Sequence, residues 1–237
     1  MILFTTRGRT SKSNMTKPQQ ILSAERLSEL GLPAHEALYR QLKLRVMNGL
    51  VDPGQAMTLR GLATEFGVSM TPAREAVRRL MAEGALKLST SGRISITKLT
   101  NERIEELAAL RMMLEAELAS RALSRAHGAL IDRMEEINRQ IGNAIRNHDP
   151  KDYVRLNLDF HRILYLRAQA PAMLALAETV WLQLGPTMQS LYTQHRRSTA
   201  AESHQKIISS LRAGDEPSLR LAIRADINGG LRMLVRP

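Results

Sequence analysis

The chain has 237 residues, of which 43% are hydrophobic and only 3% aromatic, so it can bury real cores but lacks the side chains that strands favour. Its formal net charge of +11 is uneven: the first 99 residues carry +8 and the other 138 carry +3. The composition excludes wholesale disorder, favours a mainly α fold and predicts a polyanionic partner for the N-terminal part, either nucleic acid or an anionic membrane surface.

Several kinds of segment are missing. No run of 18 apolar residues occurs, so we expect no transmembrane helix and no membrane partner. The apolar start at Met1–Phe4 is too short for a secretory signal, and residues 1–32 are expected to be a flexible basic tail and lead-in. Met15 is an alternative start, which would leave residues 1–14 outside the native chain. The absence of cysteine excludes disulfides and thiolate chemistry, and cytoplasmic residence fits these features.

Residues 33–98 begin with two segments of helical periodicity, at 33–49 and 58–66, separated by the turn Asp52-Pro53-Gly54. A third helix starts at Ser69 or Thr71, both of which are common N-cap residues. The helix carries Arg74, Arg78 and Arg79 and is expected to end at Gly84.

After this helix, residues 85–89 and 93–97 alternate in polarity about Thr90-Ser91-Gly92, which predicts a small β-hairpin. Two short helices joined by a tight turn and followed by a basic hairpin are typical of a winged helix-turn-helix. We therefore predict a DNA-binding domain at residues 33–98.

Strand signals vanish from Thr100 onward, where a helix-capping threonine precedes a long helical segment ending near residue 123. Further helices are expected at 129–147, 151–169, 172–195, 200–213 and 216–234, and Gly185-Pro186 should kink or interrupt the fourth helix of this part. Residues 99–237 thus predict an all-α bundle of about six helices.

The third helix of the N-terminal domain is the element predicted to contact the bases of DNA. Arg74 and Arg78 are four residues apart and share a face, where arginine can bond bidentately to guanine in the major groove. Ser69 and Thr71 at the helix start suit phosphate oxygens. Arginines on an exposed helix can also serve solubility alone, but that interpretation does not predict helix-turn-helix spacing, a basic wing and charge concentrated in one domain.

The stretch GVSMTPAREAVRRLMAEGAL resembles the signature of the GntR superfamily of bacterial transcription regulators. The helical part, through LRMMLEAELASRAL, NLDFHRIL and ESHQKIISSLRAGD, is similar to the FCD ligand-binding domain of the FadR branch. The resemblance covers residues 33–235. It implies a homodimeric regulator, expected to be a repressor, which binds a palindromic DNA operator and responds to a small metabolite. The DNA contacts it implies fall on Arg60, Ser69, Thr71, Arg74, Gly92 and Arg93.

Two positions depart from the family pattern. Met70 stands where arginine is usual, so a base or phosphate contact is expected to be missing and the operator to differ from the common half-site. Leu59 replaces a usual acidic residue, which is a milder departure. Met70 is kept among the predicted DNA-binding residues, together with Arg78.

The FCD resemblance also implies a divalent metal site in the bundle. Its ligand positions fall on Asn157, His161, His204 and Asp226, the last in place of a usual histidine, and these donors suit Zn²⁺, Mn²⁺ or Ni²⁺. Taken alone, each histidine is more often a satisfied core or surface residue. Arg111 and Tyr165 are candidates for binding a carboxylate effector; the alternatives are a surface salt bridge and simple packing.

Two other classes of function stay open. Two histidines and an aspartate in a helical cavity would suit a metal-dependent enzyme, although no nucleophile motif, glycine-rich phosphate loop or HExxH sequence is present. An architectural DNA-coating protein needs only the basic N-terminal part and leaves the large helical part unexplained. We expect a regulator that is not an enzyme.

Overall fold

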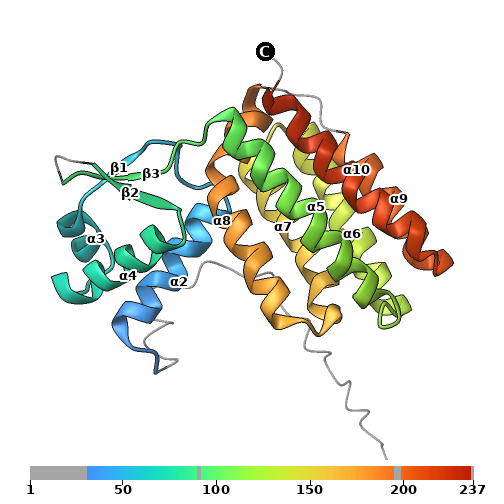
Figure 1. Ribbon diagram of the computed structural model, residues 1–237, viewed down its shortest axis with the longest axis horizontal. Helices are drawn as coiled ribbons and strands as arrows, with labels where there is room; N and C mark the ends of the chain where they lie inside the picture. The colour runs from blue at the N-terminus through green and yellow to red at the C-terminus, as the bar shows by residue number, and fades with distance from the viewer. Residues whose placement is uncertain (1–30, 90–91, 195–198, 236–237) are drawn as a thin grey trace, which may run out of the picture.

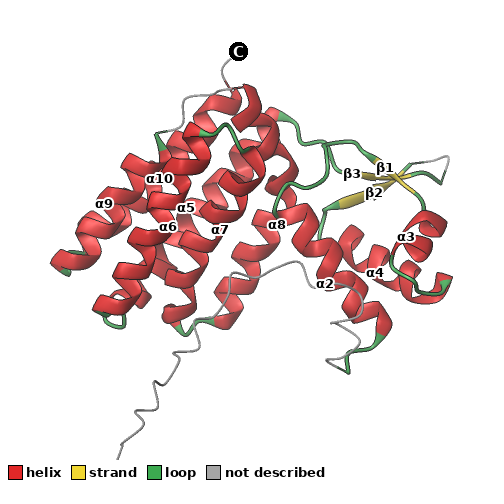
Figure 2. Ribbon diagram, turned by 180° about the vertical axis from the view of Figure 1, so that it is seen from behind, coloured by secondary structure: helices red, strands yellow, loops and turns green. Residues whose placement is uncertain are grey.

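The computed structural model describes residues 31–89, 92–194 and 199–235, so the predicted tail lies almost wholly outside the described part. Figure 1 shows two parts, with a small sheet and short helices at one end and a bundle of long helices at the other. In Figure 2 the strands are confined to the end of the molecule that holds α3 and α4. The predicted fold class, a mainly α chain with an N-terminal winged helix-turn-helix and a helical C-terminal part, is confirmed.

All the predicted elements of the N-terminal part are present. Its order is α2 (Ala34–Met47), β1 (Ala56–Met57), α3 (Leu59–Glu65), α4 (Met70–Ala82), β2 (Leu86–Leu88) and β3 (Ile94–Ile96). The strands form an antiparallel sheet in the order β1-β3-β2, with Ala56 opposite Ser95 and Leu86 opposite Ile96. The sequence does not predict β1, because two residues are too few to show an alternating pattern. This strand joins the segment between α2 and α3 to the wing.

Helix α4 begins and ends where its flanking residues predict. Ser69 is the N-cap, with extended backbone, and Gly84 lies two residues after the helix with a φ of +78°, a left-handed conformation that glycine adopts without strain. Ala73, Val77 and Leu80 are buried at helical spacing, and α4 packs against both α2 and α3. The opposite face of α4 is left in solvent.

The C-terminal part contains the six predicted helices. They are α5 (Asn101–Leu123), α6 (Gly128–Arg146), α7 (Pro150–Tyr165, followed by a 3₁₀ turn at Leu166–Ala168), α8 (Pro171–Gln194), α9 (Ala200–Ala213) and α10 (Glu216–Val235). Thr100 caps α5 as predicted, since its hydroxyl accepts from the backbone N–H of Arg103. Only residues 97–100 join β3 to α5. Among the described helices, none is long and apolar enough to cross a membrane.

Helix α8 runs unbroken through Pro186, so the predicted interruption at Gly185-Pro186 is wrong, while the alternative, a kink, stays a prediction. Proline removes one helical N–H donor and usually weakens a helix at that point. Here the neighbouring side chains Trp181, Leu182 and Leu184 are buried, and tertiary packing of this kind stabilises a helix more than local propensity does.

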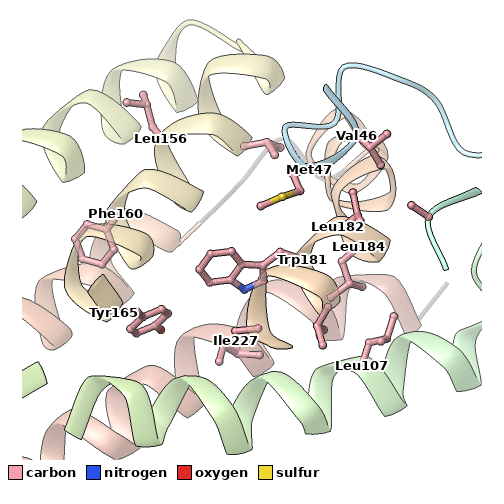
Figure 3. Close-up of a cluster of buried hydrophobic side chains, with 14 of the residues drawn as sticks. Val46, Met47, Leu107, Leu156, Phe160, Tyr165, Trp181, Leu182, Leu184 and Ile227 are labelled. Atoms are coloured by element: carbon pink, nitrogen blue, oxygen red, sulfur yellow. The ribbon is translucent and has the colours of Figure 1, made fainter. Parts of the chain in front are cut away.

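One continuous hydrophobic cluster runs through both parts of the molecule. Figure 3 shows Trp181 of α8 near its centre, with Tyr165 and Ile227 from the bundle nearby and Met47 of α2 reaching in from the N-terminal part. The N-terminal part is therefore packed on the bundle through shared apolar contacts. This packing brings α2 close to the candidate ligand site described below.

Candidate nucleic-acid interface and metal centre

The solvent face of α4 carries the residues predicted to read DNA. Met70, Thr71, Arg74 and Arg78 are all exposed, with Met70 41% exposed at the first helical position. Arg74 and Arg78 form no ion pair or hydrogen bond with any residue that the structure describes. Two free guanidinium groups one turn apart are thus available for an external anion or base.

The neighbouring Arg79 has a different role. Its Nη1 lies 2.8 Å from Glu36 Oε2, and its guanidinium stacks over the Tyr39 ring at 3.6 Å from the centroid. Arg79 therefore holds α4 against α2. Among the three arginines of this helix, the structure separates one packing residue from two free ones.

The other predicted DNA-binding residues lie around the start of α4 and in the wing. Ser69 is exposed and its hydroxyl makes no capping bond within the helix, which leaves it and the first N–H groups of α4 available to a phosphate. Arg60 is exposed on α3. Gly92 has a φ of +77° and precedes the exposed Arg93, whose backbone N–H donates to Ser89 Oγ; residues 90 and 91 lie outside the described part.

Three of the four predicted metal ligands meet inside the bundle. His161 of α7, His204 of α9 and Asp226 of α10 place one ligand atom each within 4.8 Å of one another. Asp226 lies 3.2 Å from His161 Nε2 and 3.7 Å from His204 Nε2. Both histidines are buried, and neither Nε2 atom has a hydrogen-bond partner among the described residues.

The hydrogen bonds of His204 indicate its tautomer. Its Nδ1 lies 3.1 Å from Asn138 Oδ1, and Asn138 Nδ2 donates to the carbonyl of Ala201 at 2.9 Å. With the amide oriented this way, its oxygen can only accept, so we assign the proton to His204 Nδ1. The lone pair of Nε2 then faces Asp226. Burial lowers the pKa of His204 to about 4, so the ring is neutral at pH 7.

A second chain of hydrogen bonds assigns His161 in the same way. Tyr165 Oη donates to Glu115 Oε2 at 3.0 Å and therefore accepts from His161 Nδ1 at 3.2 Å. The Nε2 lone pair of His161 also faces Asp226. Two lone pairs thus converge with a buried carboxylate.

This donor set fits a divalent cation. Imidazole nitrogens and a carboxylate are ligands that Zn²⁺, Mn²⁺ and Ni²⁺ accept, and the Nδ1 bonds supply the orienting partners that such histidines have. Asn157 lies one helical turn before His161 and is half-buried. It lines a cavity of about 20 Å³ with Arg111, Met47 and Trp181, so its role as a ligand stays a prediction.

Residues 106–229 match the FCD domain, and residues 34–96 match the family of bacterial regulatory proteins named after gntR. The chain belongs to the GntR family. It is a DNA-binding transcription regulator with an FCD domain, which fits the FadR branch.

Several known regulators are similar to this chain. The HTH-type transcriptional regulator McbR of Escherichia coli (strain K12) is 23% identical over 182 residues, covering 76% of this chain and 82% of McbR. The gluconate operon transcriptional repressor of Bacillus subtilis (strain 168) is 26% identical over 165 residues, covering 70% of this chain and 66% of the repressor. The solved structure of E. coli McbR/YncC shares the fold, with a TM-score of 0.78 at 21% identity, covering 86% of this chain and 97% of that one.

The GntR regulator also contains a buried polar network that the sequence analysis missed. Glu115 is 0% exposed and accepts from Arg111 Nε at 2.5 Å, from Trp181 Nε1 at 2.8 Å and from Tyr165. The predicted effector residues Arg111 and Tyr165 are therefore joined through this carboxylate, and the Arg111 ion pair is buried and not at the surface. The i,i+4 spacing of Arg111 and Glu115 and the single tryptophan were the available signals.

Proposed function

We propose that this regulator is a homodimeric repressor that binds a palindromic operator through its two winged helices. A small carboxylate effector in the FCD domain changes its affinity for that operator. The observation that carries the DNA-reading assignment is a pair of exposed arginines on the outer face of α4, Arg74 and Arg78, which have no partner in the described part of the chain. The name of the gluconate operon relative supports the repressor role. Such a regulator works in the cytoplasm, where a bacterial chromosome is accessible.

The α4 proposal predicts different losses for different arginines. Arg74→Ala should weaken binding to the operator by ~1–3 kcal/mol and relax base preference, whereas Arg93→Ala should weaken all duplexes alike. Arg125→Ala, on an exposed bundle arginine after α5, is the matched control and should change neither. Footprinting and titration of genomic fragments provide the measurement. An unchanged base preference in Arg74→Ala would refute the assignment, and uniform coating without a protected palindrome would favour the architectural alternative.

Exposed apolar side chains on the bundle support the homodimer. Leu110 and Met113 of α5, Leu176 of α8 and Leu221 of α10 are all exposed, and α5 packs against both other helices. Exposed large apolar side chains of this kind are typical of a subunit interface.

Met113→Glu should therefore convert the dimer to a monomer, because it would place two charges in an apolar contact related by two-fold symmetry. Sedimentation equilibrium measures the result. Leu88→Glu, which adds the same charge at an exposed leucine of the wing, should leave the dimer intact. An unchanged mass for Met113→Glu would place the interface elsewhere.

The effector proposal rests on the cluster of His161, His204 and Asp226 and on Arg111. A bound divalent metal supplies a positive centre that accepts an effector carboxylate. Arg111 donates to Glu115 from Nε and Nη2 and lines the cavity, so its Nη1, which has no partner among the described residues, could donate to a ligand there. The role proposed for this cluster is binding and not catalysis. Turnover of a bound small acid would favour the enzyme alternative.

A further inference from the structure

The C-terminal ends of two helices of the DNA-reading part meet one helix of the bundle. In Figure 1, α2 lies beside α8, and α8 also contacts α5 of the bundle. Helix α2 ends at Met47, and α4 ends at Ala82 with Glu83 as its C-cap. Both ends are contacted by residues 183–185 of α8, so this short stretch holds the reading part in place.

Gly185 allows a close approach between the two parts. A Cβ atom added at Gly185 would lie 2.4 Å from the carbonyl oxygen of Val46 and 2.5 Å from that of Met47. These are backbone atoms at the end of α2, which cannot rotate away as a side chain would. Any larger residue at Gly185 must therefore shift α2 relative to α8.

Gln183 links the end of α4 to the bundle. Its Nε2 donates to the carbonyl of Glu83 at 3.0 Å, and its Oε1 accepts from Arg103 Nη2 of α5 at 3.1 Å. Both ends of the amide are thus engaged, one by each part of the molecule. The bond to Glu83 satisfies a carbonyl at the C-terminus of α4, a position that has no partner within its own helix.

Side-chain contacts between α2 and α4 hold the two helices in a fixed relative position. Tyr39 Oη of α2 donates to Glu83 Oε1 at 2.6 Å, and Lys43 Nζ lies 3.4 Å from Glu83 Oε2. Arg79 adds its ion pair to Glu36. A displacement of α2 or α4 at its contact with α8 therefore also moves the exposed face of α4, which carries Arg74.

We infer that Gln183 and Gly185 are positioning residues that fix the orientation of α4 on the bundle and thereby set the operator spacing that the dimer accepts. The inference rests on the proposed function, a dimer that binds two half-sites. In such a dimer the separation of the half-sites follows from the separation of the two recognition helices, near 34–36 Å or a multiple of it. Side chains of α4 specify the bases, whereas the contacts on α8 specify the distance between half-sites.

Selection of duplexes from a random-sequence library by the full-length protein measures the preferred half-site sequence and the preferred half-site separation independently. The wild type should enrich inverted repeats of one separation by at least about fivefold over repeats one base pair longer or shorter. Gly185→Ala and Gln183→Met should select the same half-site but reduce this preference to below about twofold. Arg74→Ala should do the reverse, with an altered half-site and a retained separation.

Gly142→Ala on α6 is the matched control, because its added Cβ would meet only Arg146 Nη1 at an ordinary 3.5 Å. It should keep both half-site and separation. If Gly185→Ala does not fold, Gln183→Met, which preserves side-chain volume, decides the question. A wild-type separation preference in the folded variants, or a wild type indifferent to separation, would overturn the inference. A wild type that enriches no inverted repeat would instead refute the proposed function.

Discussion

Glu115→Ala should destabilise the protein by about 3–5 kcal/mol, the largest loss expected from one polar substitution in the bundle. Glu115 is fully buried and accepts hydrogen bonds from Arg111, Trp181 and Tyr165. Removing the carboxylate would leave the Arg111 guanidinium charged and unpaired in the interior, together with two unsatisfied donors. The free energy of unfolding from urea titration measures the effect.

Glu106→Ala is the control on the same helix. Glu106 is 58% exposed and pairs with Arg103 across three residues, an arrangement that contributes only about 0–1 kcal/mol. A loss for Glu115→Ala no larger than that of Glu106→Ala would show that the buried network contributes little. A substantial loss with unchanged DNA binding in the remaining folded fraction would limit the role of Glu115 to stability.

His161→Ala should abolish metal binding by the bundle. Wild-type protein purified under metal-replete conditions should contain about one divalent ion per chain, held by two imidazoles and one carboxylate. The variant loses a ligand at the centre of the cluster, and elemental analysis of both proteins measures the difference. Asn138→Leu should weaken metal binding less, by about 10–100-fold, because Asn138 only orients His204.

The exposed His127, at the start of α6, provides the control for His161. His127→Ala should retain the ion. Absence of metal from both wild type and His161→Ala under replete conditions would refute the metal site. The DNA-reading proposal would be unaffected, because it depends on α4 alone.

The sequence predicts best those features that depend on local spacing. The helix starts at Ser69 and Thr100 and the buried face of α4 follow from capping and periodicity, which act over a few residues. The family resemblance indicated that His161, His204 and Asp226 would meet, although their helices are far apart in the sequence. No local sequence pattern would have predicted that these three residues lie together.

The features that the sequence does not predict depend on tertiary packing. Arg111 and Glu115 have the spacing of an ordinary surface pair, and only the packing of α8 and of Tyr165 over them reveals a buried network. The same limit applies to Pro186, whose helix-breaking tendency is overcome by buried neighbours. Strand β1 exists because β3 lies beside it.

The cavity lined by Arg111, Asn157 and Met47 has a volume of about 20 Å³, which is room for about one water molecule. The carboxylate effector proposed above needs more room than this, so its binding here would require the cavity to open. Its apparent affinity is then the intrinsic affinity reduced by the fraction of open molecules. Met47 belongs to α2, so opening the cavity would also displace α2 and α4. The two movements would then be parts of the same conformational equilibrium. Under the proposed function, effector and operator would therefore change each other's affinity by the same factor.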